Sequence, residues 1–444
     1  MASTYLTISA STPTSAQIGT MSFWVKRSGL SSTQILMAWD ENSTTYSRLY
    51  FNDSDRLAFK SLDNGNNYGE LITNRLFRDT SAWYHIVCTI DTTNGTSGDR
   101  IKYYVNGVRE TSFDTESQPS QNRNLKIGEA SNYIGRHSSS YYFDGSMTHL
   151  HYVDGTAYQA STFGESDSVS SIWKPKTSPT ISEYGLNGVF LKFENSGAMG
   201  TDSSGKGNTY TVSGNLTQNV DTASNNFITI NPLDNYYPAC TFSNGNTTVA
   251  TGNNYSYCQS TIYVNTGKYY WEVKAVSKSS GADEFMIGIQ GKSATATNSP
   301  AQSNNGITYY KDGDTYGFGG GGTSYGNSYT VGDIIGVALD CDNNKLYFSK
   351  NGTWQNSGDP TSGATGTGAL AITDPNDVPQ GGYSPVGGAY TSVSHTLSFN
   401  FGQGYFGTTA VASANADANG VGKMEYAVPS GYYTLNTKNL KEFG

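Results

Sequence analysis

The sequence is poor in charged residues, cysteine and histidine, and it has no long apolar run. Only 14% of its 444 residues are charged, which disfavours long solvated helices because these present charged faces to water. No stretch approaches the ~20 consecutive apolar residues of a membrane-spanning helix. The opening residues, Met-Ala-Ser-Thr-Tyr, include no basic start and no apolar segment. We therefore expect no signal peptide and synthesis in a cytoplasm.

The four cysteines are widely spaced and have no histidine cluster beside them. They are Cys88, Cys240, Cys258 and Cys341. Since no Cys-x-x-Cys pair is present, a zinc site is not expected, and buried thiols are the better prediction. Cys240 and Cys258 flank a polar segment and could pair if oxidised, but disulfides are uncommon in chains without an export signal.

Net charge and the abundant residues narrow the fold and the partners. The formal net charge of −9 disfavours nucleic acid as a partner, because proteins that grip phosphate backbones concentrate Lys and Arg. The chain contains 51 Gly and 33 Tyr, a composition typical of many short strands joined by tight turns. Its length suits two cores rather than one. We predict an all-β protein with two antiparallel β-sandwich (jelly-roll) domains in series and a short C-terminal tail.

Period-two patterns fill the first 200 residues. Residues 21–27 alternate large apolar side chains with small or charged ones, as a half-buried antiparallel strand does. Asn106-Gly107 is a strong hairpin signal. Further strands are predicted at 48–51, 57–59, 83–90, 101–105, 125–128 and 146–153. The apolar stretch 189–193 is expected to return and complete the same sandwich.

Short motifs in this stretch carry a first family resemblance. They are Phe23-Trp-Val25, Trp83-x-His85, Tyr104-Val-Asn-Gly107, Ile127-Gly128 and Phe143-Asp-Gly145. Their order and spacing resemble a laminin-G or concanavalin-like jelly-roll domain over residues 1 to 200. The resemblance implies a many-stranded sandwich that binds sugars or proteins, in some members with calcium in an apical loop. The same fold also occurs in glycoside hydrolases.

The polar turn at residues 202–208 is the one candidate for a bound ion. It offers oxygen ligands for calcium, but Asp202 is its lone carboxylate, whereas Ca²⁺ sites usually recruit several. A structural turn is therefore favoured over a metal site. We predict no cofactor and no metal, with calcium kept as an alternative.

A sharper pattern occupies residues 226–406. Short strands, most of them closed by Gly or Asn-Gly turns, are predicted at 267–273, 285–289, 316–318, 332–340, 345–352 and 397–402. This succession resembles the SPRY (B30.2-like) domain, which implies a bent two-sheet sandwich that binds proteins through variable loops and has no general catalytic activity. The Gly-rich insert at 317–326 departs from the family pattern, which puts the carry-over of a peptide-binding pocket in doubt.

These patterns divide the chain into three predicted segments. They are a laminin-G/concanavalin-like domain at 1–221, a SPRY-like domain at 222–406 and a C-terminal extension at 407–444. Stretches at 143–145, 173–175, 202–205, 226–233 and 426–440 resemble virion proteins of marine bacteriophages that join the same two modules. This resemblance implies a non-enzymatic virion structural protein, an exposed tail fibre or capsid-attached appendage.

An enzymatic role is not expected from the residues. A glycoside hydrolase needs two carboxylates about 5–10 Å apart, and no Glu-x-Asp-x-x-Glu strand motif is present. Glu129, Glu165 and Glu194 are isolated, which predicts solvated carboxylates. His149 and His151 fall on one face of a predicted strand, but no third metal ligand is identifiable. Hydrogen-bonded sheet histidines are the favoured interpretation.

Surface recognition is the remaining function, and tyrosines in loops are its best candidates, because Tyr offers contact area and a hydroxyl at low entropy cost. The candidate binding residues are Tyr133, Tyr141, Tyr142, Tyr309, Tyr310, Tyr325 and Tyr329. Packing at strand edges is the alternative for half or more of them. The expected partners of a homo-oligomeric virion component are other virion proteins and a host-surface glycan or protein. A secreted carbohydrate-binding adhesin and a polysaccharide hydrolase remain as alternatives.

Overall fold

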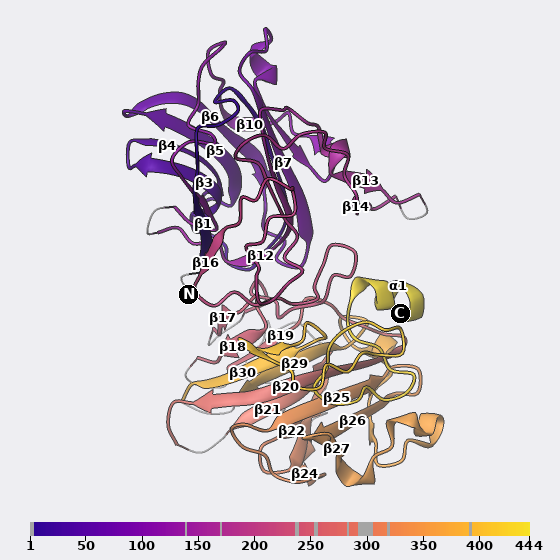
Figure 1. The fold of residues 1–444 in the computed structure, drawn as a ribbon. Helices are drawn as coiled ribbons and strands as arrows, with labels where there is room; N and C mark the ends of the chain where they lie inside the picture. Colours follow the sequence, from indigo (N-terminus) through magenta and orange to yellow (C-terminus); the bar gives the residue numbers. More distant parts are fainter. Residues whose placement is uncertain are drawn as a thin grey trace. The chain divides into compact units, whose positions relative to one another are not determined.

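Two compact units make up the chain, Met1–Gln218 and Asn219–Gly444. The computed structural model describes residues 4–137, 140–168, 171–235, 239–252, 256–281, 284–291, 305–317, 320–389 and 393–444. The units run from indigo to magenta and from salmon to yellow in Figure 1. The paired strands of both units are antiparallel sheets, as predicted. The described part of the chain has no helix with the length and hydrophobicity that crossing a membrane requires.

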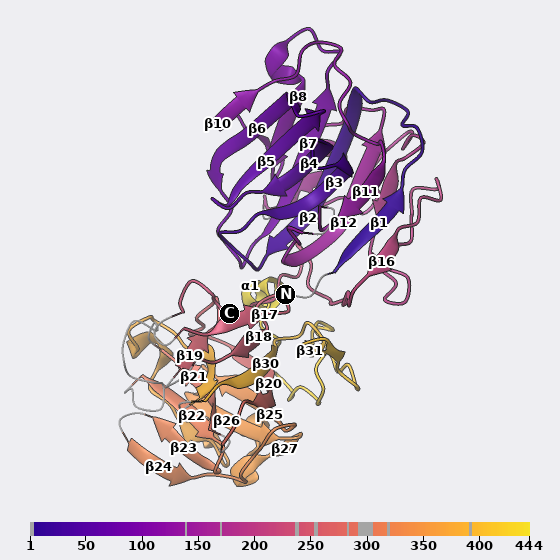
Figure 2. The same ribbon diagram turned by 90° about the vertical axis from the view of Figure 1, so that its left-hand side faces the viewer.

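The first unit is a sandwich of an eight-stranded and a six-stranded sheet. The larger sheet has the spatial order β10 (Phe113–Ser117), β6 (Asn66–Leu76), β5 (Arg56–Asp63), β4 (Thr45–Phe51), β3 (Gln34–Asn42), β11 (Ser131–Ile134), β1 (Tyr5–Ser9) and β16 (Thr211–Ser213). Its labels run across the unit from β10 to β16 in Figure 2. The smaller sheet has the order β15 (Val189–Leu191), β12 (Gly145–Asp154), β2 (Ile18–Arg27), β7 (Trp83–Asp91), β8 (Ile101–Val105) and β9 (Val108–Arg109).

Alternation along the strands builds the core between these sheets. In β2, Phe23 and Val25 are buried in the main core, whereas Ser22 bonds to His85 on the opposite face. Strand β15 pairs with β12, so the predicted return of this stretch is confirmed. The strand predicted at 125–128 is wrong, because this stretch is a bend. Its apolar residues Leu125 and Ile127 are nevertheless buried in the core.

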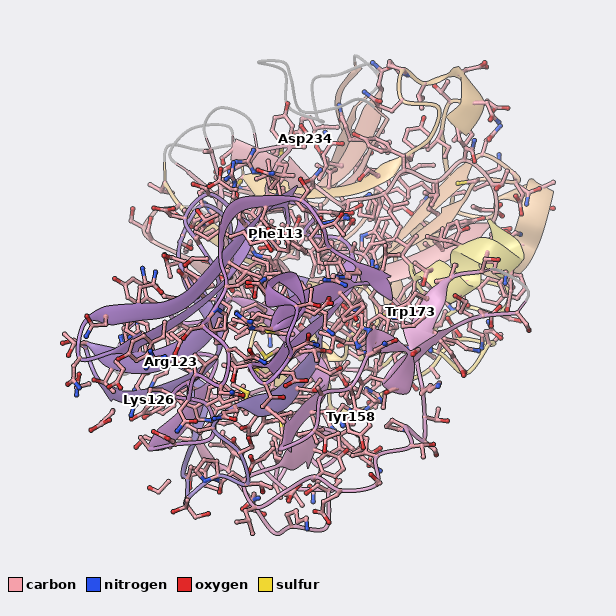
Figure 3. All side chains as sticks on the ribbon, turned by 90° about the horizontal axis from the view of Figure 1, so that it is seen from above. Phe113, Arg123, Lys126, Tyr158, Trp173 and Asp234 are labelled. Atoms are coloured by element: carbon pink, nitrogen blue, oxygen red, sulfur yellow. The ribbon has the colours of Figure 1, made fainter. Side chains whose placement is uncertain are left out.

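A strap, residues 156–168 and 171–187, covers the outer face of the smaller sheet. It carries the hairpin β13 (Gly164–Ser166) and β14 (Trp173–Pro175). Figure 3 labels two of its aromatic residues, Tyr158 and Trp173. Both pack with the buried outer-face cluster that includes Val87. The strap gives the smaller sheet a second hydrophobic layer.

His85 is one of the residues that connect the strap to the smaller sheet. Trp173 donates from Nε1 to Nδ1 of His85 at 2.9 Å, so the proton of the neutral ring lies on Nε2, 2.9 Å from Ser22 Oγ. The imidazole stacks on Trp24 and Trp173 with centroid distances of 4.8 and 6.0 Å. Burial among these rings lowers the pKa of His85 to about 3.

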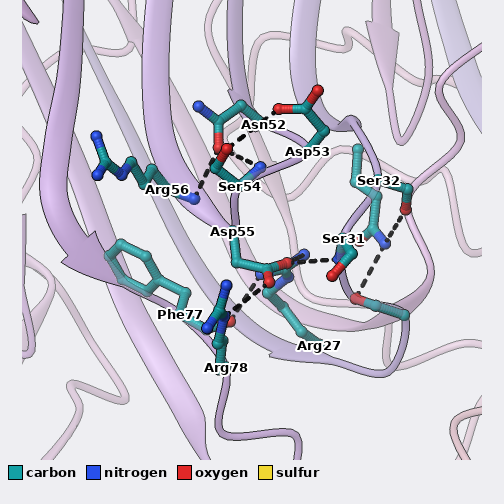
Figure 4. A network of polar contacts seen from close by, with 12 residues as sticks. Arg27, Ser31, Ser32, Asn52, Asp53, Ser54, Asp55, Arg56, Phe77 and Arg78 are labelled. Atoms are coloured by element: carbon teal, nitrogen blue, oxygen red, sulfur yellow. Dashed lines mark hydrogen bonds and ion pairs between the residues drawn. The ribbon is translucent and has the colours of Figure 1, made fainter. Parts of the chain in front are cut away.

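A buried ion pair lies at the end of β2 (Figure 4). Arg27 is fully buried and donates from Nη2 to Asp55 at 3.0 Å and from Nη1 to the Phe77 carbonyl at 2.7 Å. Asp55 also accepts from the Ser31 backbone N–H at 2.7 Å and from Arg78 Nε at 3.0 Å. Asp55 therefore satisfies a buried cation and a loop amide at once.

The second unit is also a sandwich of two sheets. The larger has the order β17 (Thr241–Ser243), β18 (Thr248–Ala250), β30 (His395–Asn400), β20 (Lys268–Lys278), β25 (Ile334–Asp340), β26 (Lys345–Lys350) and β27 (Thr353–Trp354), with β28 (Leu370–Ala371) also paired to β26. The smaller has the order β19 (Ser256–Gln259), β29 (Ser384–Ala389), β21 (Phe285–Gln290), β22 (Gly306–Tyr310), β23 (Asp314–Gly317) and β24 (Gly320–Ser324). Residues 318 and 319 of the Gly-rich insert lie outside the described residues.

The predicted C-terminal extension is an integral part of the second unit, which corrects the sequence-based division. It contains β32 (Thr409–Ala410), which forms a hairpin with the preceding β31 (Tyr405–Phe406), and the helix α1 (Thr437–Phe443). Met424 and Tyr432 are buried against Tyr270 of β20. The carboxylate of Glu272 accepts the backbone N–H groups of Glu425 and Tyr426, both at 2.8 Å. These contacts are made by single residues in a stretch of small, polar residues. Because that stretch has no strand or helix periodicity, the sequence pattern does not predict its packing.

Candidate functional site

The outer surface of the larger sheet in the first unit gathers aromatic and charged side chains. Along β1 and β11, Leu6 and Ile134 are buried in the core, so alternation places Tyr5 and Tyr133 on the outside. Tyr142 comes from the loop that follows β11. We call Tyr5, Tyr133, Arg136, Tyr141 and Tyr142 the tyrosine face.

Three rings of the tyrosine face lie close together, and two of them contact one guanidinium. Tyr5 lies 6.5 Å from Tyr133 and 6.3 Å from Tyr142 between ring centroids, with interplanar angles of 57° and 50°. The Cζ atom of Arg136 lies 3.4 Å from the Tyr5 ring centroid and 4.8 Å from that of Tyr133. These distances are those of cation–π contacts.

A second charged group borders the tyrosine face. His137 Nδ1 lies 2.6 Å from Asp40 Oδ2, and Arg48 Nε donates to Asp40 Oδ1 at 3.1 Å. Arg48 also contacts His137 Nε2, and its Cζ lies 3.3 Å from the ring centroid of Tyr46. These contacts hold His137 rigidly as a platform for the neighbouring aromatic ring.

Tyr141 is the most exposed ring of the tyrosine face. Its side chain is 50% exposed and lies parallel to the His137 ring, 6.2 Å away with an interplanar angle of 7°. Its backbone has a φ of 59°, which is unusual for a bulky residue. The carbonyl of Tyr141 accepts from the Ile35 N–H at 3.0 Å, which fixes the loop to β3. A strained, exposed aromatic residue is a reasonable marker of function.

The hydroxyl groups of the tyrosine face are available to a ligand. Among the described residues, those of Tyr5, Tyr133, Tyr141 and Tyr142 have no hydrogen-bond partner. Of the three tyrosines predicted in the first domain, Tyr133 and Tyr142 both lie beside Tyr5, whereas Tyr141 stacks on His137. Sequence reasoning missed Tyr5 and Arg136, although the alternation around each strand was a usable signal for Tyr5.

Three of the four tyrosines predicted in the second domain are core residues, which corrects their assignment as binding residues. Tyr309, Tyr325 and Tyr329 are at most 6% exposed. Their hydroxyls donate to backbone carbonyls, as in the 2.9 Å bond from Tyr329 to the Tyr309 carbonyl. Because Tyr buries its ring well once the hydroxyl has an acceptor, composition could not separate them from surface tyrosines. Only Tyr310 is partly exposed, 5.3 Å from the Tyr316 ring.

The carboxylates considered for hydrolysis lie in ordinary surface settings. Glu129 pairs with Lys126 at 3.2 Å, and Glu165 lies 3.9 Å from Lys174 with 49% of its side chain exposed. The side chain of Glu194 is 75% exposed. These settings suit solvated charges rather than a proton donor.

The histidines and Asp202 have structural partners. His151 is buried, 2.8 Å from the Tyr184 hydroxyl and stacked on Phe190. Asp202 accepts backbone N–H groups from Phe190, Ser204 and Asn208 at 2.8–3.0 Å, so its carboxylate braces the turn. Within the described ranges, no group of three or more His, Cys, Asp or Glu side chains is placed to hold a metal ion. All four cysteines are buried and unbridged.

Curated relatives match a short part of the chain. Ran-binding protein 9 of Danio rerio is 35% identical over 88 residues, which are 19% of this chain and 14% of that protein. Ran-binding protein 9 of Homo sapiens is 36% identical over 88 residues, 19% of this chain and 12% of that protein. The chain thus spans less than one sixth of the length of these relatives.

Two family models match separate parts of the chain. The concanavalin A-like lectin/glucanases superfamily matches residues 1–161, and the SPRY domain matches residues 268–373. Among solved structures, the SPRY domain of human HERC1 aligns with 38% of this chain and 96% of that chain at 19% identity and a TM-score of 0.30. A human SPRY domain aligns with 36% and 93% at 16% identity and a TM-score of 0.26. Residues 1–161 are thus similar to concanavalin A-like domains and residues 268–373 to SPRY domains.

Proposed function

We propose that this chain is a non-enzymatic structural protein of a bacteriophage virion, an exposed tail fibre or capsid appendage, that binds saccharide on the host surface. The observation that carries the binding role is the tyrosine face, where the Arg136 guanidinium contacts the rings of Tyr5 and Tyr133 and the half-exposed ring of Tyr141 stacks on His137. The match to a lectin-like superfamily supports this role. The virion assignment rests on the sequence resemblance to marine bacteriophage proteins.

The second unit takes the role of a protein-binding module in this proposal. The SPRY match supports it, because SPRY-type domains generally mediate protein interactions. Other virion proteins, including further copies of this chain in a symmetric assembly, are the partners that a virion component would contact. A secreted adhesin would use the same tyrosine face, so the virion assignment needs its own experiment.

Replacing Tyr141 by glycine is expected to weaken saccharide binding without weakening the fold. Loss of one central aromatic anchor reduces affinity by roughly tenfold. Glycine accepts the positive φ of this position, so the substitution removes backbone strain while it removes the ring. The measurement is the binding of the full-length chain to a microarray of neutral and acidic polysaccharides, together with its thermal unfolding.

Tyr310→Ala is the matched control for this prediction, because Tyr310 is a partly exposed tyrosine of the other unit. It is expected to leave saccharide binding unchanged. Equal binding by the wild type and Tyr141→Gly, or a larger loss in Tyr310→Ala, would show that the tyrosine face is not the binding site.

Immunogold electron microscopy tests the virion assignment independently. Antibody raised against the recombinant chain is expected to label tail or capsid appendages of purified bacteriophage particles. Particles that remain unlabelled, with the chain recovered free from infected cultures, would favour a released adhesin instead.

A further inference from the structure

We infer that the saccharide bound by the tyrosine face is acidic, and that Arg136 binds its carboxylate. This inference rests on the proposed function, since it names the ligand class of the same face. It starts from one observation: the Arg136 guanidinium is packed between two rings but has no hydrogen-bond acceptor among the described residues.

Arg136 is held in position by stacking alone. Its Cζ lies over the ring of Tyr5 from β1 and beside that of Tyr133 from β11. Because β1 and β11 are paired in the sheet, the positions of both tyrosines are fixed relative to each other. The Nε atom is buried without a partner, which is costly for a charged donor. A guanidinium fixed in this way is prepared for an incoming acceptor, because little side-chain freedom remains to be lost on binding.

Other ring-stacked arginines of the same unit show what Arg136 lacks. Arg27 lies 4.4 Å from the Phe51 ring centroid and pairs with Asp55. Arg48 lies over Tyr46 and pairs with Asp40. In both cases a carboxylate completes the guanidinium, whose fork matches two carboxylate oxygens. At Arg136, which is partly buried, the described residues supply the rings but no carboxylate, so a ligand is the remaining source; Arg123, the ring-stacked arginine that also has no carboxylate partner among them, is exposed to water instead.

Local charge favours an anionic ligand despite the chain's net charge of −9. Asp40 interacts through Oδ1 with Arg48 and through Oδ2 with His137, the residue that follows Arg136 in the chain. Arg48 therefore counters the charge of Asp40, whereas Arg136 has no carboxylate partner among the described residues. The Tyr5 ring that contacts Arg136 also lies 6.3 Å from the Tyr142 ring, and the unpaired hydroxyls of these two tyrosines suit the hydroxyl groups of a sugar ring.

Binding of three probes to the full-length chain tests the inference: a galacturonic acid hexasaccharide, its carboxyl-reduced neutral form, and a sulfated galactan of similar length. We expect the carboxylate form to bind roughly tenfold to hundredfold more tightly than the neutral form, the range expected for a charged hydrogen bond. Arg136→Gln is expected to abolish this preference, and Arg136→Lys to restore part of it. The preference should also weaken as salt is raised.

Arg123→Gln is the matched control. Arg123, labelled in Figure 3, also stacks on a tyrosine of the first unit, with its Cζ 4.2 Å from the Tyr68 ring centroid. The Arg123→Gln variant should keep the preference for the acidic over the neutral hexasaccharide. Equal binding of the acidic and neutral hexasaccharides, or tighter binding of the sulfated galactan, overturns the inference and leaves the proposed function standing. No binding of any probe overturns the inference, and the polysaccharide microarray then decides the proposed function separately.

Discussion

Replacing Asp55 by asparagine is expected to destabilise the first unit by roughly 3–5 kcal/mol, the cost of leaving a buried charge unpaired. Arg27 is fully buried, and Asp55 is its only carboxylate partner among the described residues. Asparagine tolerates the positive φ of 61° at this position, so the backbone conformation is preserved. The change therefore removes the negative charge and little else. Urea unfolding of the full-length chain, followed through hydrogen exchange of β2 and β7 peptides, measures the loss.

A surface pair provides the control for this large effect. Arg56 and Asp114 lie 2.6 Å apart, but the Asp114 side chain is 48% exposed. Asp114→Ala is expected to change stability by no more than about 1 kcal/mol, because water screens exposed ion pairs. The double variant Arg27→Met, Asp55→Asn should recover part of the loss, since it removes the unpaired charge as well. Equal losses for the Asp55 and Asp114 variants would contradict this account.

Acidification below pH 6.5 is expected to destabilise the first unit steeply. Burial lowers the pKa of His85 to about 3 and holds the pKa of His151 well below its ordinary value of 6.5. The groups that face them are aromatic rings, hydroxyls and the neighbouring His149. In acid, the two histidines therefore bind protons in the unfolded chain but stay neutral in the folded unit. Each histidine costs roughly 1.4 kcal/mol per pH unit, so the two together cost about 2.7 kcal/mol for each pH unit between pH 6.5 and pH 4.5.

The second unit carries one group with the opposite dependence. Burial raises the pKa of Glu272 to about 7, although its backbone and side-chain donors oppose the shift. Its folded pKa lies above the ordinary value of 4.5, so this group stabilises the folded state at low pH. That contribution is lost as pH rises from about 4.5 to about 7. Lowering the pH should thus destabilise the first unit through its two buried histidines and stabilise the second unit through Glu272.

Hydrogen exchange at several pH values, corrected for the intrinsic exchange rate, separates the two units. His85→Gln should reduce the pH dependence of first-unit stability by roughly 1.4 kcal/mol per pH unit, because glutamine can still bond to Ser22 and Trp173 but does not titrate. Glu272→Gln should change only the dependence of the second unit. A first-unit dependence that is the same in the wild type and His85→Gln would contradict the assignment of the effect to this histidine.

Two groups of tyrosines show how much of the candidate site could be predicted from the sequence pattern. Alternation in β11 places Asn132 and Ile134 in the core, so Tyr133 could be assigned to the outside from the sequence. Tyr325 lies within the Gly-rich insert and Tyr329 follows it, and both are predicted as exposed loop residues, yet both are buried. Their hydroxyls reach backbone carbonyls of Gly368, Phe285 and Tyr309, and these acceptors are supplied by other segments of the unit.

The sequence by itself determined most of the strands and the all-β class of both units, because period-two alternation and Asn-Gly turns are local properties of the chain. Asn106 and Gly107 adopt the positive φ angles that such a turn requires. Only the tertiary structure decided that Arg136 lies between the rings of Tyr5 and Tyr133, and that residues 407–444 pack into the second unit. These contacts join residues far apart in the sequence. They depend on strand order and on burial of single side chains, which no local pattern records.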